Sequence, residues 1–135
     1  MRALEHINPD SLHASPAFSH AVRVPAGSDM VYVGGQNGTG PDGNLVGPDV
    51  GSQTRQAFEN LQTCLQAADA TLADVVKWTI LCVDGVDMQE GFAASADILP
   101  ADAAPPAITV AIVSGLAVPG AVVEIEAVAV VPDTD

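Results

Sequence analysis

The chain has 135 residues, enough for one domain over residues 1–135, and 48% of them are hydrophobic, so a sizeable core is expected. Four Lys and Arg residues stand against 17 Asp and Glu, which gives this acidic protein a formal net charge of −13 at pH 7. A surface of that sign repels phosphate backbones and argues against a nucleic-acid partner. Because no apolar run reaches the ~18 residues of a membrane helix, we expect no membrane partner either.

The N-terminal residues lack a charged head followed by an apolar segment, so we expect no signal peptide. Cys64 and Cys82 each lie in an apolar pattern, which favours two buried free thiols over a disulfide or a metal pair. These features indicate a cytoplasmic protein. His6 and His13 lack metal-ligand spacing to any Cys or carboxylate, and we expect neither a metal nor another cofactor.

Short apolar segments open the chain. Residues 2–7 predict a first strand, and the Asn-Pro-Asp-Ser sequence at 8–11 ends it. Residues 21–24 and 30–33 predict two strands that pair with each other across a turn at residues 25–29. The glycine-rich segment 34–38 then leads to a further turn at residues 41–44. That segment suits either an anion held by backbone N–H groups or a tight corner where another chain segment comes close.

From residue 50 the hydrophobic spacing becomes helical and predicts a long amphipathic helix over residues 50–69. Residues 75–83 form an almost continuous apolar run, typical of a strand that is covered on both faces. Asp87 and Glu90 have the spacing of a capping box. A second helix is predicted to follow them, and we expect the prolines from position 100 onward to end it. Its apolar stripe consists of Met88, Phe92, Ser95, Ala96 and Leu99.

Residues 108–113 and 122–131 predict the last two strands. The order βββαβαββ indicates an α+β fold with two helices on one face of a sheet. Two helices cover only one face, and several strands are apolar on both. We therefore expect copies of the chain to associate through the other face or the sheet edges.

Two carboxylates interrupt the last predicted strand, VVEIEAVAVV. Strand alternation places Glu124 and Glu126 on one face, roughly 6–7 Å apart. A carboxylate in such a place can act as a general base toward water or a general acid toward a leaving amine. Both can equally be structural and accept hydrogen bonds at a subunit interface, and the sequence leaves the two interpretations open.

The segments FSHAVRV, VYVGGQNGTGPDGNLVG, TRQAFENL, ADVVKWTILCVD and VVEIEAVAVV resemble the Rid (YjgF-like, L-PSP endoribonuclease-like) family. The resemblance covers residues 15–131. It implies a chorismate-mutase-like fold and a homotrimer whose sheets form a central barrel, with a cleft between each pair of subunits. Characterised members hydrolyse enamine and imine intermediates of amino-acid metabolism to keto acids and ammonia. Some members have instead been described as ribonucleases that act on messenger RNA.

The resemblance also implies the residues of the cleft. Phe18 corresponds to an aromatic residue near the N-terminus, and the backbone around Gly35 and Gln36 lines the cleft. Glu124 matches a glutamate that holds the attacking water. Ile108 occupies the place of the arginine that binds the substrate carboxylate in the deaminases.

Isoleucine cannot replace an arginine fork, which holds a carboxylate through two charge-assisted hydrogen bonds worth about 1.5–3 kcal/mol each. Arg23 is the one other cation that we keep as a candidate for ligand binding. The first hypothesis is therefore a trimer that binds a small neutral metabolite in the cleft. Whether it is an enzyme stays open: it would hydrolyse an enamine or imine C=N bond, without being an efficient 2-imino acid deaminase.

Two alternatives remain. One is a metabolite-binding or regulatory protein without catalysis, which keeps the trimer and has lost the chemistry. The other is an endoribonuclease or translation inhibitor by family analogy, against which the net charge of −13 argues.

Overall fold

A computed structural model describes residues 3–133. Its elements, in chain order, are β1 (Glu5–Ile7), β2 (Ala21–Arg23), β3 (Asp29–Gln36), α1 (Val50–Ala67), the short 3₁₀ turn η1 (Leu72–Asp74), β4 (Val75–Val83), α2 (Met88–Ser95), β5 (Ala107–Val113) and β6 (Val123–Val131). The predicted α+β fold and the order βββαβαββ are confirmed. The proposed start of the first strand at residue 2 lies outside the described residues.

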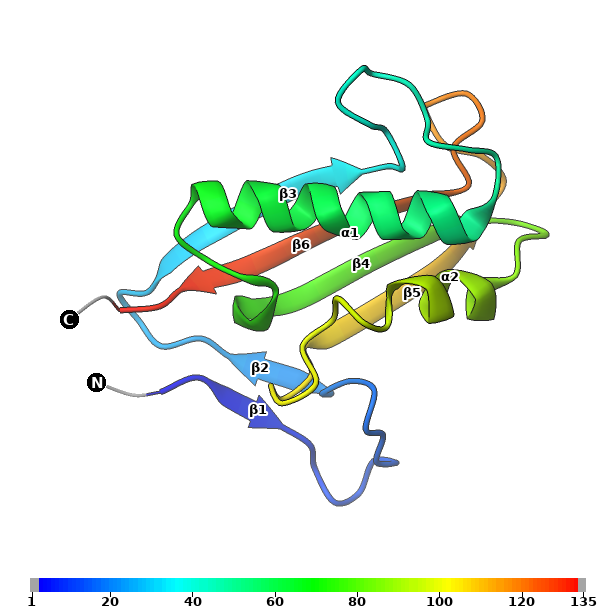
Figure 1. The fold of residues 1–135 in the computed structure, drawn as a ribbon. Coiled ribbons are helices and arrows are strands. Elements are labelled where there is room, and N and C mark those ends of the chain that lie inside the picture. The colour runs from blue at the N-terminus through cyan, green and yellow to red at the C-terminus, as the bar shows by residue number, and fades with distance from the viewer. Residues whose placement is uncertain (1–2, 134–135) are drawn as a thin grey trace.

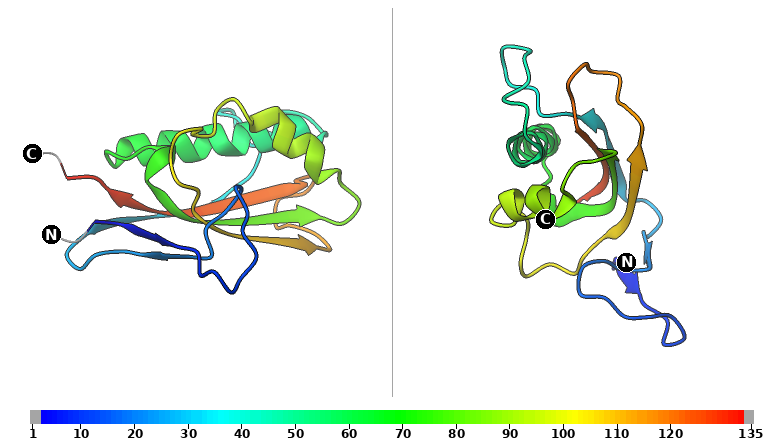
Figure 2. Two further views of the ribbon diagram at one scale, coloured as in Figure 1. Left: turned by 90° about the horizontal axis from the view of Figure 1, so that it is seen from below. Right: turned by 90° about the vertical axis from the view of Figure 1, so that its right-hand side faces the viewer.

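Four strands form a mixed sheet in the order β3-β6-β4-β5, in which β5 runs parallel to β4 and the other pairs are antiparallel. Both helices lie on one face of this sheet (Figures 1 and 2). The helix α2 connects the two parallel strands, as such crossovers require.

The expected pairing of the second and third strands is wrong. β2 pairs with β1 in a separate two-stranded sheet, whereas β3 pairs with β6. The turn between β2 and β3 contains Gly27 at φ 84°, and it leads the chain from one sheet to the other. Val33 of β3 belongs to the main core and Val31 packs against it, because β3 pairs with the long strand β6. Figure 1 shows the β1–β2 sheet beyond the β5 edge.

The core lies between the helices and the four-stranded sheet. Alternate residues of β6 are buried toward the helices, from Val123 at 1% exposure to Ala129 at 0%. Leu61 and Leu65 of α1 are fully buried against them. Phe58 of α1 and Trp78 of β4 pack edge to face with their ring centroids 5.3 Å apart. This alternation directs the intervening side chains of β6 toward the opposite face.

Two details of the helices differ from expectation. Cys82 is buried as predicted, but Cys64 is exposed, because the buried stripe of α1 runs through Phe58, Leu61 and Leu65 and leaves position 64 at its margin. The second helix ends at Ser95 rather than at Pro100. The hydroxyl of Ser95 donates back to the carbonyl of Gly91 at 3.1 Å, a bond that competes with regular helix geometry.

Candidate functional site

Glu124 lies on the sheet face opposite the helices. Its neighbours Val123 and Ile125 are buried toward the helices, so the half-buried Glu124 side chain points away from them. Its Oε1 accepts a hydrogen bond from Nδ2 of Asn37 at 3.2 Å, and the same amide donates to the carbonyl of Val123 at 3.2 Å. Asn37 thereby fixes both the backbone and the carboxylate of this part of β6.

Gly35 provides the space for this carboxylate. The pairing of β3 with β6 shifts register between Val33 and Gln36, which places Gly35 in a bulge beside Glu124. A Cβ atom at Gly35 would fall 2.5 Å from Oε2 of Glu124, closer than two such atoms can approach. The glycine-rich segment therefore forms the tight corner that was one of its two interpretations.

Gln53 is a residue that the sequence analysis did not single out. It is fully buried on α1, and its Nε2 donates to the carbonyls of Gly47 at 2.8 Å and Gly120 at 3.1 Å. Its Oε1 accepts from the backbone N–H of Val122 at 2.9 Å. The side chain thus joins the loop before α1 to the loop before β6 and fixes the start of the strand that carries Glu124. The sequence signal that could have found Gln53 is a polar glutamine on the expected core-facing side of the helix, three residues after Val50.

Ile108 lies on the other side of the sheet from Glu124. It pairs with Trp78 in the parallel register of β5 with β4, and it packs against the core. It lines a cavity of about 280 Å³ between the helices and the sheet. Within one chain, therefore, Ile108 and Glu124 do not share a site.

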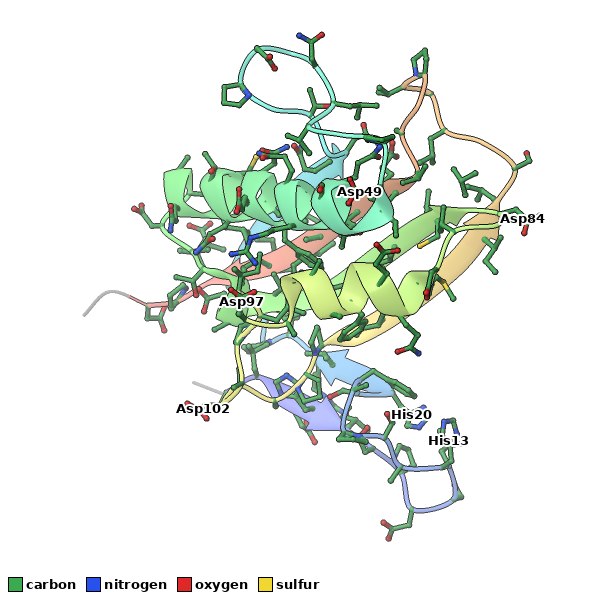
Figure 3. All side chains as sticks on the ribbon, turned by 45° about the vertical axis from the view of Figure 1, so that its right-hand side comes forward. His13, His20, Asp49, Asp84, Asp97 and Asp102 are labelled. Carbon is green, nitrogen blue, oxygen red and sulfur yellow. The ribbon has the colours of Figure 1, made fainter. Side chains whose placement is uncertain are left out.

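Phe18 lies on the Ile108 side. Its ring meets those of His13 and His20 edge to face, with centroid distances of 5.8 and 5.2 Å. Figure 3 shows His13 and His20 beside each other in the loop between β1 and β2. The next residue, Ser19, is buried and donates its backbone N–H to Pro106 and its hydroxyl to Pro105, which ties this loop to the start of β5.

The cations of the described residues are mostly engaged. Arg23 pairs with Glu5 at 3.2 Å on the two-stranded sheet, where both side chains are about half exposed. Arg55 pairs with Asp97 at 2.6 Å, and the hydrogen bond from this guanidinium lowers the pKa of Asp97. Lys77 donates to the hydroxyl of Thr109 at 2.5 Å. The structure thus brings Gly35, Gln36 and Glu124 together, and leaves Phe18, Ile108 and Arg23 apart from them.

Across residues 3–133, no three His, Cys, Asp or Glu side chains come together in a way that could hold a metal ion. In the same part of the chain, neither helix combines the length and the apolar character needed to cross a membrane.

Comparison with protein families matches residues 9–131 to the family described as Endoribonuclease L-PSP. Among solved structures, a Rid-family protein, YyfB of Yersinia pestis, has a TM-score of 0.82 and 35% identity, and the match covers 94% of this chain and 98% of that one. RutC family protein YjgH of Escherichia coli is 38% identical over 55% of this chain. A rat 2-iminobutanoate/2-iminopropanoate deaminase is 41% identical over 50% of it. These two matches span 53% and 48% of the relatives' own lengths, about half of each.

Proposed function

Because the chain belongs to the Endoribonuclease L-PSP family, also called the Rid or YjgF-like family, we propose that it binds a small uncharged metabolite and hydrolyses the C=N bond of an imine, or of the imine tautomer of an enamine. The observation that carries this proposal is the placement of Glu124. Its carboxylate is half-buried, held by the Asn37 amide and set against a glycine that leaves room beside the backbone.

The opposed positions of Glu124 and Ile108 support a cleft shared between copies. One chain holds the acid on the open face of the sheet, and the apolar cavity lies on the helix face. A cleft that contains both needs the acid of one copy and the Ile108 side of another. The proposed assembly is a homotrimer, in agreement with the sequence resemblance.

The chemistry assigned to Glu124 is general acid–base catalysis. Its carboxylate takes a proton from water as the water oxygen attacks the carbon of the C=N bond, and then passes this proton to the nitrogen to give a carbinolamine. The carboxylate next takes the proton of the carbinolamine hydroxyl and delivers it to the nitrogen, so that the C–N bond breaks, ammonia or an amine leaves, and a carbonyl product remains. Water is the only co-reactant, so the step needs no oxidant or cofactor.

An uncharged substrate fits this site better than a 2-imino acid. The resemblance places the carboxylate-binding arginine of the deaminases at Ile108, and Arg23 and Arg55 are both ion-paired elsewhere. With a net charge of −13, the protein also repels anions. On this proposal, the protein is not an efficient 2-imino acid deaminase.

A second candidate function is ligand binding without turnover, and the apolar character of the cavity beside Ile108 favours it. In this case the assembly senses or stores a metabolite, and Glu124 only holds the loop that contains Asn37. Ribonuclease activity stays the third candidate, against which the net charge argues.

The experiment compares Glu124→Gln with Glu126→Gln, which removes a carboxylate two residues away on the same face. An amine oxidase supplies uncharged imines from primary amines, and the readout is ammonia release above the spontaneous rate. We expect Glu124→Gln to lower kcat/KM by about 10²–10⁴-fold, because general acid–base catalysis contributes that much. Glu126→Gln should stay close to the unchanged protein. Equal rates in both variants would contradict the role of Glu124, and ligand-induced thermal shifts without any turnover would support the binding protein.

Ile108→Arg tests the substrate preference. An added guanidinium supplies the missing partner for a carboxylate, so activity on 2-iminopropanoate should rise by about tenfold or more. The measurement is the rate with imino acid generated by an amino-acid oxidase. If the unchanged protein already hydrolyses this substrate as fast as the variant does, the proposed preference for uncharged ligands is wrong.

A further inference from the structure

The cavity beside Ile108 is partly open and lies between the two helices and the strands β4, β5 and β6 of one chain. Phe58 of α1 and Phe92 of α2 form two walls, and Ile80 and Cys82 of β4 form the floor together with Val110 of β5. Its volume is about 280 Å³. Among the described residues that line it, none carries a charged side chain.

The polar atoms in its walls already have partners or are neutral. Ser95 is fully buried, and its hydroxyl bonds to the carbonyl of Gly91 at 3.1 Å. Burial raises the pKa of the Cys82 thiol, which therefore stays protonated at neutral pH. Throughout residues 3–133 no buried side-chain nitrogen or oxygen lacks a hydrogen-bond partner. The cavity thus offers mainly hydrocarbon contacts, the neutral Thr54 hydroxyl and Gln89 amide are its other polar groups, and no charged side chain is there to hold an ion.

We propose that this cavity binds the hydrocarbon part of an uncharged ligand, either one aromatic ring or a short alkyl chain. An apolar cavity of about 150 Å³ already suffices for benzene, so about 280 Å³ accommodates a ring with a short substituent. An α-helix is about 10 Å across and does not fit such a space. The occupant is therefore a small molecule rather than a peptide helix.

A neighbouring hollow extends the cavity toward the start of β5. This second space of about 120 Å³ shares five lining residues with the cavity and continues to Ala17, Pro105 and Pro106; the shared residues are Phe58, Ile80, Phe92, Leu99 and Ile108. The ligand's hydrocarbon lies under α2, and its polar end lies toward the start of β5. This direction rests on the proposed function, which places the acid of a second copy near Ile108, whereas the cavity itself belongs to a single chain.

The isoleucines of the chain provide a direct readout. Ile80, Ile108 and Ile125 line the cavity, whereas Ile7, Ile98 and Ile112 do not. In a protein with labelled isoleucine methyl groups, titration with 1-butanol, 1-pentanol and 1-hexanol should shift the first three signals and leave the other three in place. Affinity should rise about fourfold with each added methylene, the value expected for burying that group. Hexanoate should bind at least about tenfold more weakly than 1-hexanol, because its charge has no partner there.

Two substitutions on one strand make a matched pair. Val110→Trp places a large side chain in the cavity mouth, while Ile112→Trp lies on the same strand at a position that is 62% exposed and does not line the cavity. We expect Val110→Trp to weaken 1-hexanol binding by about tenfold or more and Ile112→Trp to leave it unchanged. If Val110→Trp fails to fold, Cys82→Met fills the same space from the interior.

Several results would overturn the inference. These are hexanoate binding as tightly as 1-hexanol, equal shifts at Ile112 and at the cavity isoleucines, or no shift at all. Shifts of the cavity isoleucines on dilution without ligand would show instead that a second copy fills the space. The same titration on Glu124→Gln separates the two proposals: intact binding with lost turnover supports both, and lost 1-hexanol binding with intact turnover rejects the cavity site alone. Intact binding with no turnover in any variant rejects only the proposed hydrolysis.

Discussion

At the scale of single residues, the proposed role of Glu124 depends on the close approach of its carboxylate to Gly35. The carboxylate is held by an amide on one side, and on the other it lies where a Cβ of residue 35 would be. The acid is thus positioned by neutral groups rather than by a cation. Because no cation neutralises the carboxylate there, it can accept a proton from water as a general base.

Gly35→Ala should therefore displace the carboxylate. The new methyl group would meet Oε2 of Glu124 at 2.5 Å, and the flexible side chain must move. We expect hydrolysis to fall by about tenfold or more, since a displacement of about 1 Å can cost about 10²-fold. Gly34→Ala is the matched control, because a Cβ there meets nothing within 4 Å. Steady-state kinetics of both variants check this, and equal activities would show that the contact does not matter.

Strand alternation and the resemblance single out Glu124 and Gly35 in the sequence, and the structure places the two side by side, while their role stays a prediction. Asn37 could not, because its bond to Glu124 joins residues 87 positions apart and depends on the bulge in β3. Hydrogen-bond partners of this kind are decided by strand register, which local patterns do not specify.

At the scale of elements, Gln53 links three backbone groups that no secondary structure pairs. Gln53→Leu keeps the approximate volume but leaves the carbonyls of Gly47 and Gly120 and the N–H of Val122 without this partner. We expect the free energy of unfolding to fall by about 2–4 kcal/mol, because each buried group without a partner costs about 1–3 kcal/mol. Denaturation in urea at fixed protein concentration measures this. The exposed Gln66 of the same helix is the control, and a loss of stability in Gln66→Leu as large as in Gln53→Leu would contradict the argument.

The long elements were predictable, and the short ones were not. α1, β4 and β6 have 18, 9 and 9 residues, and their periodicity alone locates them within a few positions. β2 has three residues, too few to determine its partner from a pattern, and the predicted pairing with β3 was wrong. The predicted end of α2 was too late in the chain. The helix already ends at Ser95, whose hydroxyl bonds to the carbonyl of Gly91, several residues before Pro100.

At the scale of the whole molecule, the charge of −13 should make stability depend on salt. Unpaired carboxylates repel one another in the folded state, and added ions screen this repulsion. We expect Tm to rise as KCl increases from about 0.05 M to about 1 M, since the Debye length falls from beyond about 10 Å to about 3 Å. Near pH 4.1, where the net charge approaches zero, the same increase should be much smaller. Thermal denaturation series at both pH values check this, and a Tm at neutral pH that does not respond to salt would contradict it.

The division of the candidate cleft between two faces is also a property of the whole molecule. The sequence alone indicated that strands apolar on both sides need cover from another copy. The fold adds that Glu124 and Ile108 lie on opposite faces of the sheet, so the two side chains of one chain do not line the same site. We therefore expect the site to be formed between copies.

Sedimentation equilibrium over a wide range of protein concentration tests whether copies assemble. We expect one species with three times the 13.7 kDa mass of a single chain, persisting at the concentrations used for kinetics. A species of 13.7 kDa that still hydrolyses imines in a Glu124-dependent manner would contradict it.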